Sequence, residues 1–332
     1  MLSNNNHRSR AGCAQGIAAF SAMLVLGLGL MAPPVAASPF AYVANVNSAN
    51  ISVIDTATNR LVATVGVGGG PIAVAVTPNG KSVYVVNSWS ANVSVIDTAA
   101  NTVVATIAVG NSPAGIAITP DGKYAYVANL GSANVSVIDT ATNEVVAIVG
   151  VGNSPSGVAI TPDGKHAYVT NLGSASVSVI DTATNKVVSL VPVGRGPFGV
   201  TVIPDGKQAY VANRRTNTVS VIDTATNQVV ATVRVGLRPS EIAVTPDGEH
   251  AYIVNERSNS VSMIDTAVNK VVATVRVGKK PEWDAITPDG KELYVANRGA
   301  NSVSVIATAT NKVVATVRVG HRPDGVGIGP PS

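Results

Sequence analysis

A tetrapeptide, Tyr-Val-X-Asn in six copies and Tyr-Ile-Val-Asn in one, occurs seven times in this sequence at a constant interval of 42 residues. Its asparagines are Asn45, Asn87, Asn129, Asn171, Asn213, Asn255 and Asn297. The β-branched and aromatic residues in and around each copy favour strands. Tandem units of this length, made of short strands, are typical of β-propellers. The repeat therefore predicts an all-β, seven-bladed propeller with four-stranded antiparallel blades.

One unit illustrates how the repeat encodes a blade. Short apolar runs predict strands at 114–118, 124–129, 135–138 and 145–149. Thr119-Pro120-Asp121-Gly122 separates the first two strands and has the residues of a tight turn. A variable loop at 130–134 and a second turn, Asp139-Thr140-Ala141-Thr142-Asn143, separate the others. We expect the repeated Asn and Asp to satisfy backbone and turn groups, and the repeated Tyr to pack between blades with a bonded hydroxyl.

The two ends of the repeat array predict how the ring closes. The array begins at a second strand, 41–45, and ends at a first strand, 324–328. Pairing of these two strands would complete one blade from both ends of the chain. Closure of this kind removes the open sheet edges that otherwise invite aggregation. We therefore expect residues 38–332 to form a single propeller domain.

Residues 1–37 do not fit the repeat and have the pattern of a secretory signal peptide. Basic residues near the start are followed by an apolar run at 17–31 and by Val35-Ala36-Ala37. The run is short for a transmembrane helix, and an uncleaved anchor is the alternative. The sole cysteine, Cys13, lies in this segment, so we expect no disulfide after cleavage. The predicted location is the periplasm, the cell surface or the medium.

Four recurring sequence motifs cover almost all of residues 38–332, namely YVAN/YVTN, VSVIDTATN, VVATV-x-VG and TPDGK. They resemble the YVTN family of β-propeller repeats. The resemblance implies an exported seven-bladed propeller of the surface-antigen or surface-layer kind, and it implies no shared catalytic residues. One departure is Ala307, where the other six units have Asp, so we expect a looser turn there.

The units differ from one another in the loops after their second and fourth strands. In a propeller these loops share one face, called here the top face. Residues 38–185 have a formal charge of −3 and residues 186–332 of +5, and the difference is concentrated in these loops. Such an asymmetry predicts a site for a protein, an acidic polysaccharide or another anionic polymer, with nucleic acid as a further candidate. A solubilising surface is the alternative. The candidate ligand-binding residues are Arg195, Arg214, Arg215, Arg238, Arg257, Lys279, Lys280, Arg298, Arg322 and Trp89.

A second group of unusual residues lies at the start of the innermost strands, where we expect them to meet at the mouth of the central channel. These candidates are Glu241, Glu282, Trp283, Asp284, His321 and Asp324. Asp284 replaces the Ile or Val of other units, so a buried carboxylate there needs a partner. Arg322, Arg298 and Lys280 are the candidates. The group is either a small polar or metal-binding site or, as we favour, a local salt-bridge network.

The sequence favours a non-catalytic binding protein over an enzyme. Only His321 among the histidines after residue 37 is expected on the top face, and a hydrolytic triad needs His, Ser and Asp together. No zinc, phosphate-loop or cysteine-based motif occurs, and we expect no metal or other cofactor. The alternatives are a lyase or lactonase-like hydrolase acting at the channel mouth, and a structural surface-layer protein. We expect a monomer.

Overall fold

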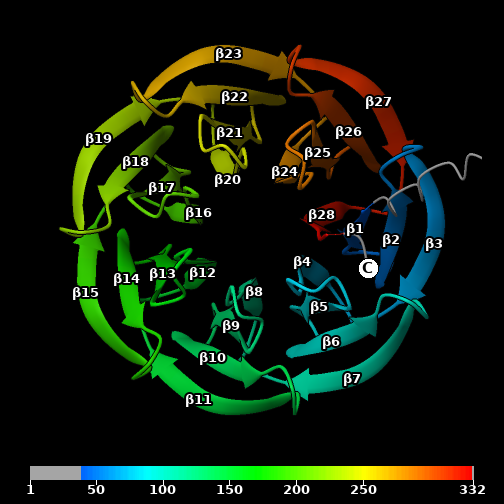
Figure 1. Ribbon diagram of the computed structural model, residues 1–332, viewed down its shortest axis with the longest axis horizontal. Coiled ribbons are helices and arrows are strands. Elements are labelled where there is room, and N and C mark those ends of the chain that lie inside the picture. The colour runs from blue at the N-terminus through cyan, green and yellow to red at the C-terminus, as the bar shows by residue number, and fades with distance from the viewer. Residues whose placement is uncertain (1–38, 331–332) are drawn as a thin grey trace, which may run out of the picture. The chain divides into compact units, whose positions relative to one another are not determined.

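In the computed structural model, residues 39–330 are described, and they form 28 β-strands and no helix. The strands make seven four-stranded antiparallel sheets arranged around a central axis (Figure 1). This arrangement confirms the seven-bladed propeller. The predicted signal peptide, residues 1–37, lies outside the described residues, so the boundary before residue 38 stays a prediction. The described part contains no helix that could span a membrane.

Each blade begins with a strand next to the axis, and its second strand lies outside it (Figure 1). The innermost strands all start at a proline and are β4 (Pro71–Val76), β8 (Pro113–Ile118), β12 (Pro155–Ile160), β16 (Pro197–Val202), β20 (Pro239–Val244), β24 (Pro281–Ile286) and β28 (Pro323–Ile328). The second strands all end at the repeated asparagine and are β1 (Phe40–Asn45), β5 (Ser82–Asn87), β9 (Tyr124–Asn129), β13 (His166–Asn171), β17 (Gln208–Asn213), β21 (His250–Asn255) and β25 (Glu292–Asn297).

The third strands are almost wholly buried, and the fourth strands form the rim of the ring (Figure 1). The third strands are β2 (Asn50–Asp55), β6 (Asn92–Asp97), β10 (Asn134–Asp139), β14 (Ser176–Asp181), β18 (Thr218–Asp223), β22 (Ser260–Asp265) and β26 (Ser302–Ala307). The rim strands are β3 (Arg60–Gly66), β7 (Thr102–Ala108), β11 (Glu144–Gly150), β15 (Lys186–Pro192), β19 (Gln228–Arg234), β23 (Lys270–Arg276) and β27 (Lys312–Arg318).

The ring closes as expected, within a blade that combines the two ends of the array. Its sheet has the strand order β28-β1-β2-β3, and β28 pairs antiparallel with β1, placing Ala41 opposite Ile328 and Val43 opposite Val326. We call this blade 1. Blades 2 to 7 follow in chain order, so that blade 5 comprises β16–β19, blade 6 comprises β20–β23, and blade 7 comprises β24–β27.

The hydrophobic core is divided into seven clusters, each formed between two neighbouring blades. Between blades 2 and 3, for example, Tyr84 and Val95 pack with Ile116 and Val127. Both faces of a blade are covered in this way, which explains why the strands are apolar on both sides. Burying one valine or isoleucine side chain contributes roughly 1.5–3 kcal/mol, so the repeated apolar pattern stabilises every blade alike.

The repeated asparagine ties the second strand to the third and covers a glycine. Asn87 donates from Nδ2 to Asn92 Oδ1 at 2.8 Å and to Ser94 Oγ at 2.9 Å. A Cβ at Gly68 would lie 2.7 Å from the Asn87 side chain, so only glycine fits there. The same asparagine and glycine recur in every blade, so the asparagine has a structural role. Its side chain bonds to side chains of the third strand, however, and not to the backbone or turn groups that we expected.

The repeated tyrosine links neighbouring blades. Tyr84 donates its hydroxyl hydrogen to Oδ1 of Asn143, in the turn of the next blade, at 2.7 Å, and burial raises the Tyr84 pKa to about 12. Equivalent bonds join the tyrosines of blades 3 to 7 to their neighbours. Tyr42 is the exception among the described residues. Asn101 has the position relative to Tyr42 that Asn143 has relative to Tyr84, but its Oδ1 has no hydrogen-bond partner. The predicted bonded hydroxyl is therefore confirmed in six blades.

The repeated aspartate closes the turn between the third and fourth strands. Asp139 Oδ1 accepts from the backbone N–H groups of Ala141 at 2.8 Å and Thr142 at 3.1 Å. Ala307 cannot do so, but the N–H of Asn311 still donates to the Ala307 carbonyl at 2.8 Å. The last turn thus keeps its backbone bond and loses only the side-chain acceptor; its expected looseness stays a prediction.

Candidate anion-binding site on the top face

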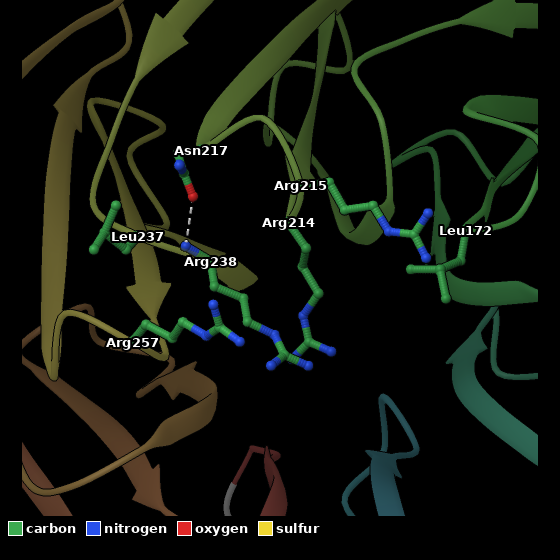
Figure 2. A pocket seen from close by; sticks show the side chains of 7 residues that line it. All are labelled: Leu172, Arg214, Arg215, Asn217, Leu237, Arg238 and Arg257. Carbon is green, nitrogen blue, oxygen red and sulfur yellow. Dashed lines mark hydrogen bonds between the residues drawn. The ribbon is translucent and has the colours of Figure 1, made fainter.

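A cavity of about 470 Å³ opens on the top face beside blades 4, 5 and 6. Four of its lining residues are arginines, and Figure 2 shows the guanidinium groups of Arg214, Arg238 and Arg257 converging while Arg215 extends toward Leu172. The lining residues are Leu172, Arg214, Arg215, Asn217, Leu237, Arg238 and Arg257. The cavity is therefore strongly basic, with two leucines as its apolar walls.

The loops that carry these arginines are held to one another by hydrogen bonds. Arg238 has φ = 56°, a left-handed conformation that is uncommon for a residue other than glycine. Its N–H donates to Asn217 Oδ1 at 2.8 Å (Figure 2), and the N–H of Arg257 donates to the Leu237 carbonyl at 3.1 Å. Because these bonds hold the backbone on both sides of the cavity, the Cα atoms of the arginines have defined positions.

Arg214 forms the floor of the cavity and is mostly buried. Its guanidinium carbon lies 3.7 Å from the centroid of the Phe198 ring, a cation–π contact. Its Nη2 forms an ion pair with Glu282 and lies 3.7 Å from Glu256 Oε2. Arg214 therefore has counter-charges in the protein, and the positive charge offered to a ligand comes chiefly from its neighbours.

Arg215 and Arg257 are those neighbours. Both are exposed, and within residues 39–330 neither takes part in an ion pair, whereas Arg238 Nε lies 2.8 Å from Glu256 Oε2. Guanidinium groups without a carboxylate partner favour phosphate, sulfate or carboxylate ligands, which they bind through paired N–H donors. These two arginines are the groups best placed to receive an anion.

A layer of buried carboxyl groups lies beside the arginines, at the mouth of the channel. Glu282 Oε2 is 3.8 Å from Arg298 Nη1, and Asp324 Oδ2 is 3.7 Å from Arg298 Nε. Burial, reinforced by Glu282, raises the Asp324 pKa from 3.8 to about 8, although Arg298 opposes the shift. Two of the six channel-mouth candidates, Glu282 and Asp324, thus take part in an ion-pair network.

Glu241 and Asp284 belong to the same buried layer but have no basic partner among the described residues. Burial raises the pKa of each well above its usual range, and the nearby Asp284 adds to the shift of Glu241, so the protonated form of each is favoured. The prediction that Arg322, Arg298 or Lys280 would pair with Asp284 is wrong. Arg298 instead pairs with Glu282 and Asp324. No hydrogen bond of good geometry reaches either oxygen of Asp284, although the backbone N–H groups of Asp284 and Ala243 oppose the rise in its pKa. The raised pKa favours the protonated form, whose burial costs less than that of an unpaired carboxylate.

Two aromatic rings lie at the axis in this layer. Trp283 of β24 contacts Phe198 of β16 edge to face, with ring centroids 6.4 Å apart. Trp283 also packs against the clusters between blades 2 and 3 and between blades 7 and 1. Since it contacts groups from several blades around the ring, Trp283 fills part of the channel that a smaller residue would leave open.

The structure brings together some of the candidates and separates others. Arg214, Arg215, Arg238 and Arg257 line one cavity, and Arg298 joins the acidic network. Lys279, Lys280, Arg195 and Arg322 do not line that cavity. Trp89 is 66% exposed in blade 2 and lies against Gly70, where a Cβ would come within 2.5 Å of its ring. His321 is exposed, and its ring lies 3.4 Å from Asn301 Nδ2 and bonds to none of the carboxyl groups.

Sequence reasoning missed Glu256 and Phe198, and the repeat itself contains the signal that identifies them. Glu256 stands 42 residues after Arg214 and 42 before Arg298, so the three occupy one repeat position with alternating charge. Phe198 stands 84 residues before Glu282, on the channel side of its own innermost strand. Arg234, Arg276 and Arg318, at the ends of three rim strands, were also overlooked.

A metal site and a depression on the opposite face are weaker candidates for the functional site. Within residues 39–330 no group of three or more His, Cys, Asp or Glu side chains is arranged to hold a metal ion. A depression of about 490 Å³ beside His166 lies on the opposite face. It is lined by turn residues, such as Asp163 and Asp205, whose counterparts recur in most blades. The basic cavity is the better candidate because its residues are specific to a few blades.

Several solved structures are similar to this chain. A hydrazine synthase structure from Kuenenia stuttgartiensis has 29% identity and a TM-score of 0.75, covering 85% of this chain and 99% of that chain. A functionally unknown protein from Desulfotomaculum acetoxidans has 20% identity and a TM-score of 0.77, covering 89% and 100%. A candidate 6-phosphogluconolactonase from Bacteroides fragilis has 20% identity and a TM-score of 0.76, covering 90% and 99%. At 20% identity the last two likenesses show the fold alone.

Sequence comparison identifies the family. No curated protein matches the chain significantly. A family model described as YNCE-like beta-propeller matches residues 35–120, 159–245 and 241–329. The finer resemblance to YVTN repeats stays a prediction beside this match. Because the matched segments cover well over half of the sequence, the chain belongs to the YNCE-like beta-propeller family.

Proposed function

We propose that this protein is an exported, non-catalytic binding propeller whose top-face cavity takes an anionic ligand. The observation that carries the proposal is the lining of one cavity of about 470 Å³ by four arginines, two of them without an ion-pair partner among the described residues. The volume lies in the range of small-molecule sites. Arg257 binds the anion beside Arg214 and Arg238, Arg215 adds positive charge from the side of Leu172, and Leu172 and Leu237 contact the apolar part of the ligand.

The same geometry favours binding over the hydrolase or lyase alternative. His321, the histidine expected at the channel mouth, bonds to none of the carboxyl groups there. Glu282, Asp284 and Asp324 are buried beneath the arginines at 2%, 4% and 6% exposure. A general base must reach the proton that it removes from a substrate. Glu282 and Asp324 are instead paired with arginines, and Asp284 is buried. The likeness to a candidate lactonase at 20% identity supports the fold only.

Export is part of the same proposal and is supported by the signal-like pattern of residues 1–37. The resemblance to YVTN repeats suggests a cell-surface or secreted location. N-terminal sequencing of the protein recovered from outside the cytoplasm of a producing cell tests this part. We expect a new N-terminus at Ser38, and an intact Met1 in that fraction contradicts cleavage.

Retention on immobilised heparin as a function of salt tests the binding proposal. The matched variants are Arg215→Ala with Arg257→Ala, and Lys123→Ala with Lys291→Ala; the two lysines lie in the turns of the opposite face. Both double variants change the net charge equally. Because contacts with the ligand release counterions, we expect the arginine variant to elute at clearly lower salt and the lysine variant to elute with the unmodified protein.

Two outcomes contradict the proposal. An equal shift of both double variants means that net charge alone governs retention. Failure of the unmodified protein to bind at low ionic strength removes the anion-binding function altogether. Circular dichroism spectra of the variants control for loss of folding.

A further inference from the structure

A second basic cavity, of about 430 Å³, lies on the rim side of blades 5 and 6. Arg234, at the end of β19, and Arg276, at the end of β23, both line it. Both are exposed, and neither takes part in an ion pair within residues 39–330. Ser258, Ser260 and Thr274 add hydroxyl groups to the lining. The rim cavity therefore offers guanidinium and hydroxyl groups, as an acidic sugar requires.

The rim cavity and the top-face cavity are the two sides of one narrow ridge. Along the chain, Arg234 to Gly236 line the rim cavity, and the next two residues, Leu237 and Arg238, line the top-face cavity. In the facing loop, Arg257 lines the top-face cavity and Ser258 lines the rim cavity. The two cavities are therefore lined by consecutive residues of the same two loops.

Hydrogen bonds make the ridge a fixed structure. The N–H of Leu237 donates to Ser258 Oγ at 2.7 Å, and the N–H of Arg257 donates to the Leu237 carbonyl at 3.1 Å. The two loops therefore hold the cavities at a constant separation. Two sites at a fixed separation favour a linked ligand, because binding at the first site raises the local concentration of the ligand at the second.

We infer that the ligand is a linear acidic polysaccharide that crosses the ridge and occupies both cavities. This inference rests on the proposed anion-binding function and extends it. One acidic group binds Arg257 on the inner side, where Arg215 adds positive charge from the opposite wall of the cavity, and another acidic group binds Arg234 and Arg276 on the rim side. The sugar units between them lie over Leu237, which is 54% exposed.

The composition of the two cavities favours a sugar chain over single-stranded nucleic acid. Proteins that bind single strands stack the bases on aromatic side chains. No described residue that lines either cavity is aromatic. Phe198 lies beneath the Arg214 guanidinium, and Trp89 belongs to blade 2. Serine and threonine hydroxyl groups instead suit the hydroxyl groups of a sugar.

A length series of uronic-acid oligosaccharides, from two to ten units, tests the inference by isothermal titration calorimetry at fixed salt. We expect the dissociation constant of the unmodified protein to fall by about a hundredfold once the oligomer spans both cavities. Arg234→Ser and Arg276→Ser should each remove most of that gain in affinity with length. Arg215→Ala with Arg257→Ala should weaken binding at every length.

Arg318→Ser is the matched control for the rim. Arg318 has the repeat position of Arg234 and Arg276 in the next blade, but it lines neither cavity. The Arg318→Ser variant should keep the full gain in affinity with oligosaccharide length. An equal loss of that gain in Arg318→Ser and Arg276→Ser overturns the inference.

The remaining outcomes separate the inference from the function on which it rests. Binding of the disaccharide without any gain at greater length overturns the two-cavity ligand and keeps the anion site. Absence of binding at every length overturns both. Tighter binding of oligothymidylate than of an equally charged oligosaccharide at the same salt assigns the cavities to nucleic acid and overturns the sugar chain.

Discussion

Blades 2 to 4 and blades 5 to 7 share one scaffold and differ in what they present at the top face. Their strands have equal lengths and nearly equal burial patterns, and their repeated asparagines make the same kind of contacts. The early blades present neutral loops and a small or apolar channel lining, whereas the late blades present arginines above buried carboxyl groups. The comparison shows that the scaffold depends on the repeated residues alone, which leaves the loop positions free to specialise.

Arg214 gives the largest expected difference between the two halves, because its counterpart in blade 4 is Leu172. Arg214→Leu should lower the free energy of unfolding by about 3 kcal/mol, since it removes the close partner of buried Glu282. Chemical denaturation measures the change. Arg215→Leu, beside it but exposed and without an ion pair in the described part, should change stability by less than about 0.5 kcal/mol. Equal effects of the two variants would show that the network does not stabilise the late blades.

Rising pH should destabilise the part of the ring that holds the buried carboxyl groups, namely the innermost strands of blades 6, 7 and 1. Burial raises the pKa of Asp324 to about 8, whereas in the unfolded chain an aspartate ionises near 3.9. Between those values the folded protein binds more protons at Asp324, so the contribution of this group to stability is fully present below pH 4, falls as the pH rises toward 8, and then levels off. Glu241 and Asp284 shift in the same direction.

Thermal melts at pH 5 and pH 8.5 check this dependence, and we expect a melting temperature roughly 5 °C lower at pH 8.5. Asp324→Asn should reduce the difference because asparagine does not ionise. Asp121→Asn, in a turn of blade 3, should leave the difference unchanged, since the Asp121 pKa is lowered to about 2 and lies outside the window. A melting temperature that is constant or rises over this range would contradict the buried neutral carboxyl groups.

Asp284→Val restores the residue that other innermost strands have at this position, and it should stabilise the protein by about 1–3 kcal/mol. The reason is that the buried carboxyl group has no ion-pair partner among the described residues and no hydrogen bond of good geometry. Denaturation at pH 7 measures the gain. The reverse exchange in an early blade, Val158→Asp, should be destabilising. If Asp284→Val lowers stability instead, the carboxyl group has a structural role that this geometry does not explain.

The smallest expected effect concerns the scaffold that the two halves share. Tyr84→Phe in blade 2 and Tyr252→Phe in blade 6 each remove a hydroxyl bond to the next blade, of 2.7 Å and 3.2 Å. Each should cost about 1 kcal/mol. Tyr42→Phe is the control, because the counterpart Asn101 Oδ1 has no partner. A loss at Tyr42 as large as at Tyr84 would show that packing, rather than the hydroxyl bond, is measured.

Much of the fold could be predicted from the sequence, because the strand and turn pattern of one unit is weak evidence alone but recurs seven times at the same spacing. The predicted strand 124–129 agrees with β9 (Tyr124–Asn129), and the predicted strand 135–138 lies within β10 (Asn134–Asp139). Ring closure followed from the ends of the array. The repeat also indicated which loops share the top face, so four candidate arginines were found to line one cavity.

The pairing of charges could not be predicted in the same way. Asp284 was assigned a basic partner because a buried charge needs one, but protonation is the other solution, and the choice depends on distances that the repeat does not encode. Glu256 was missed because only its alignment with Arg214 and Arg298 reveals it. Arg234 and Arg276 lie at strand ends, and their connection to the top-face cavity depends on how the ridge folds.

The pairing of β28 with β1 has a consequence for the order of assembly. The first strand of the ring has no inner neighbour until the last strand has been synthesised, so blade 1 cannot be completed while the chain is still growing. Until then β1 exposes a free edge that another chain could join. Nascent chains interrupted before Ile328 should consequently depend on chaperones, whereas released full-length chains should not.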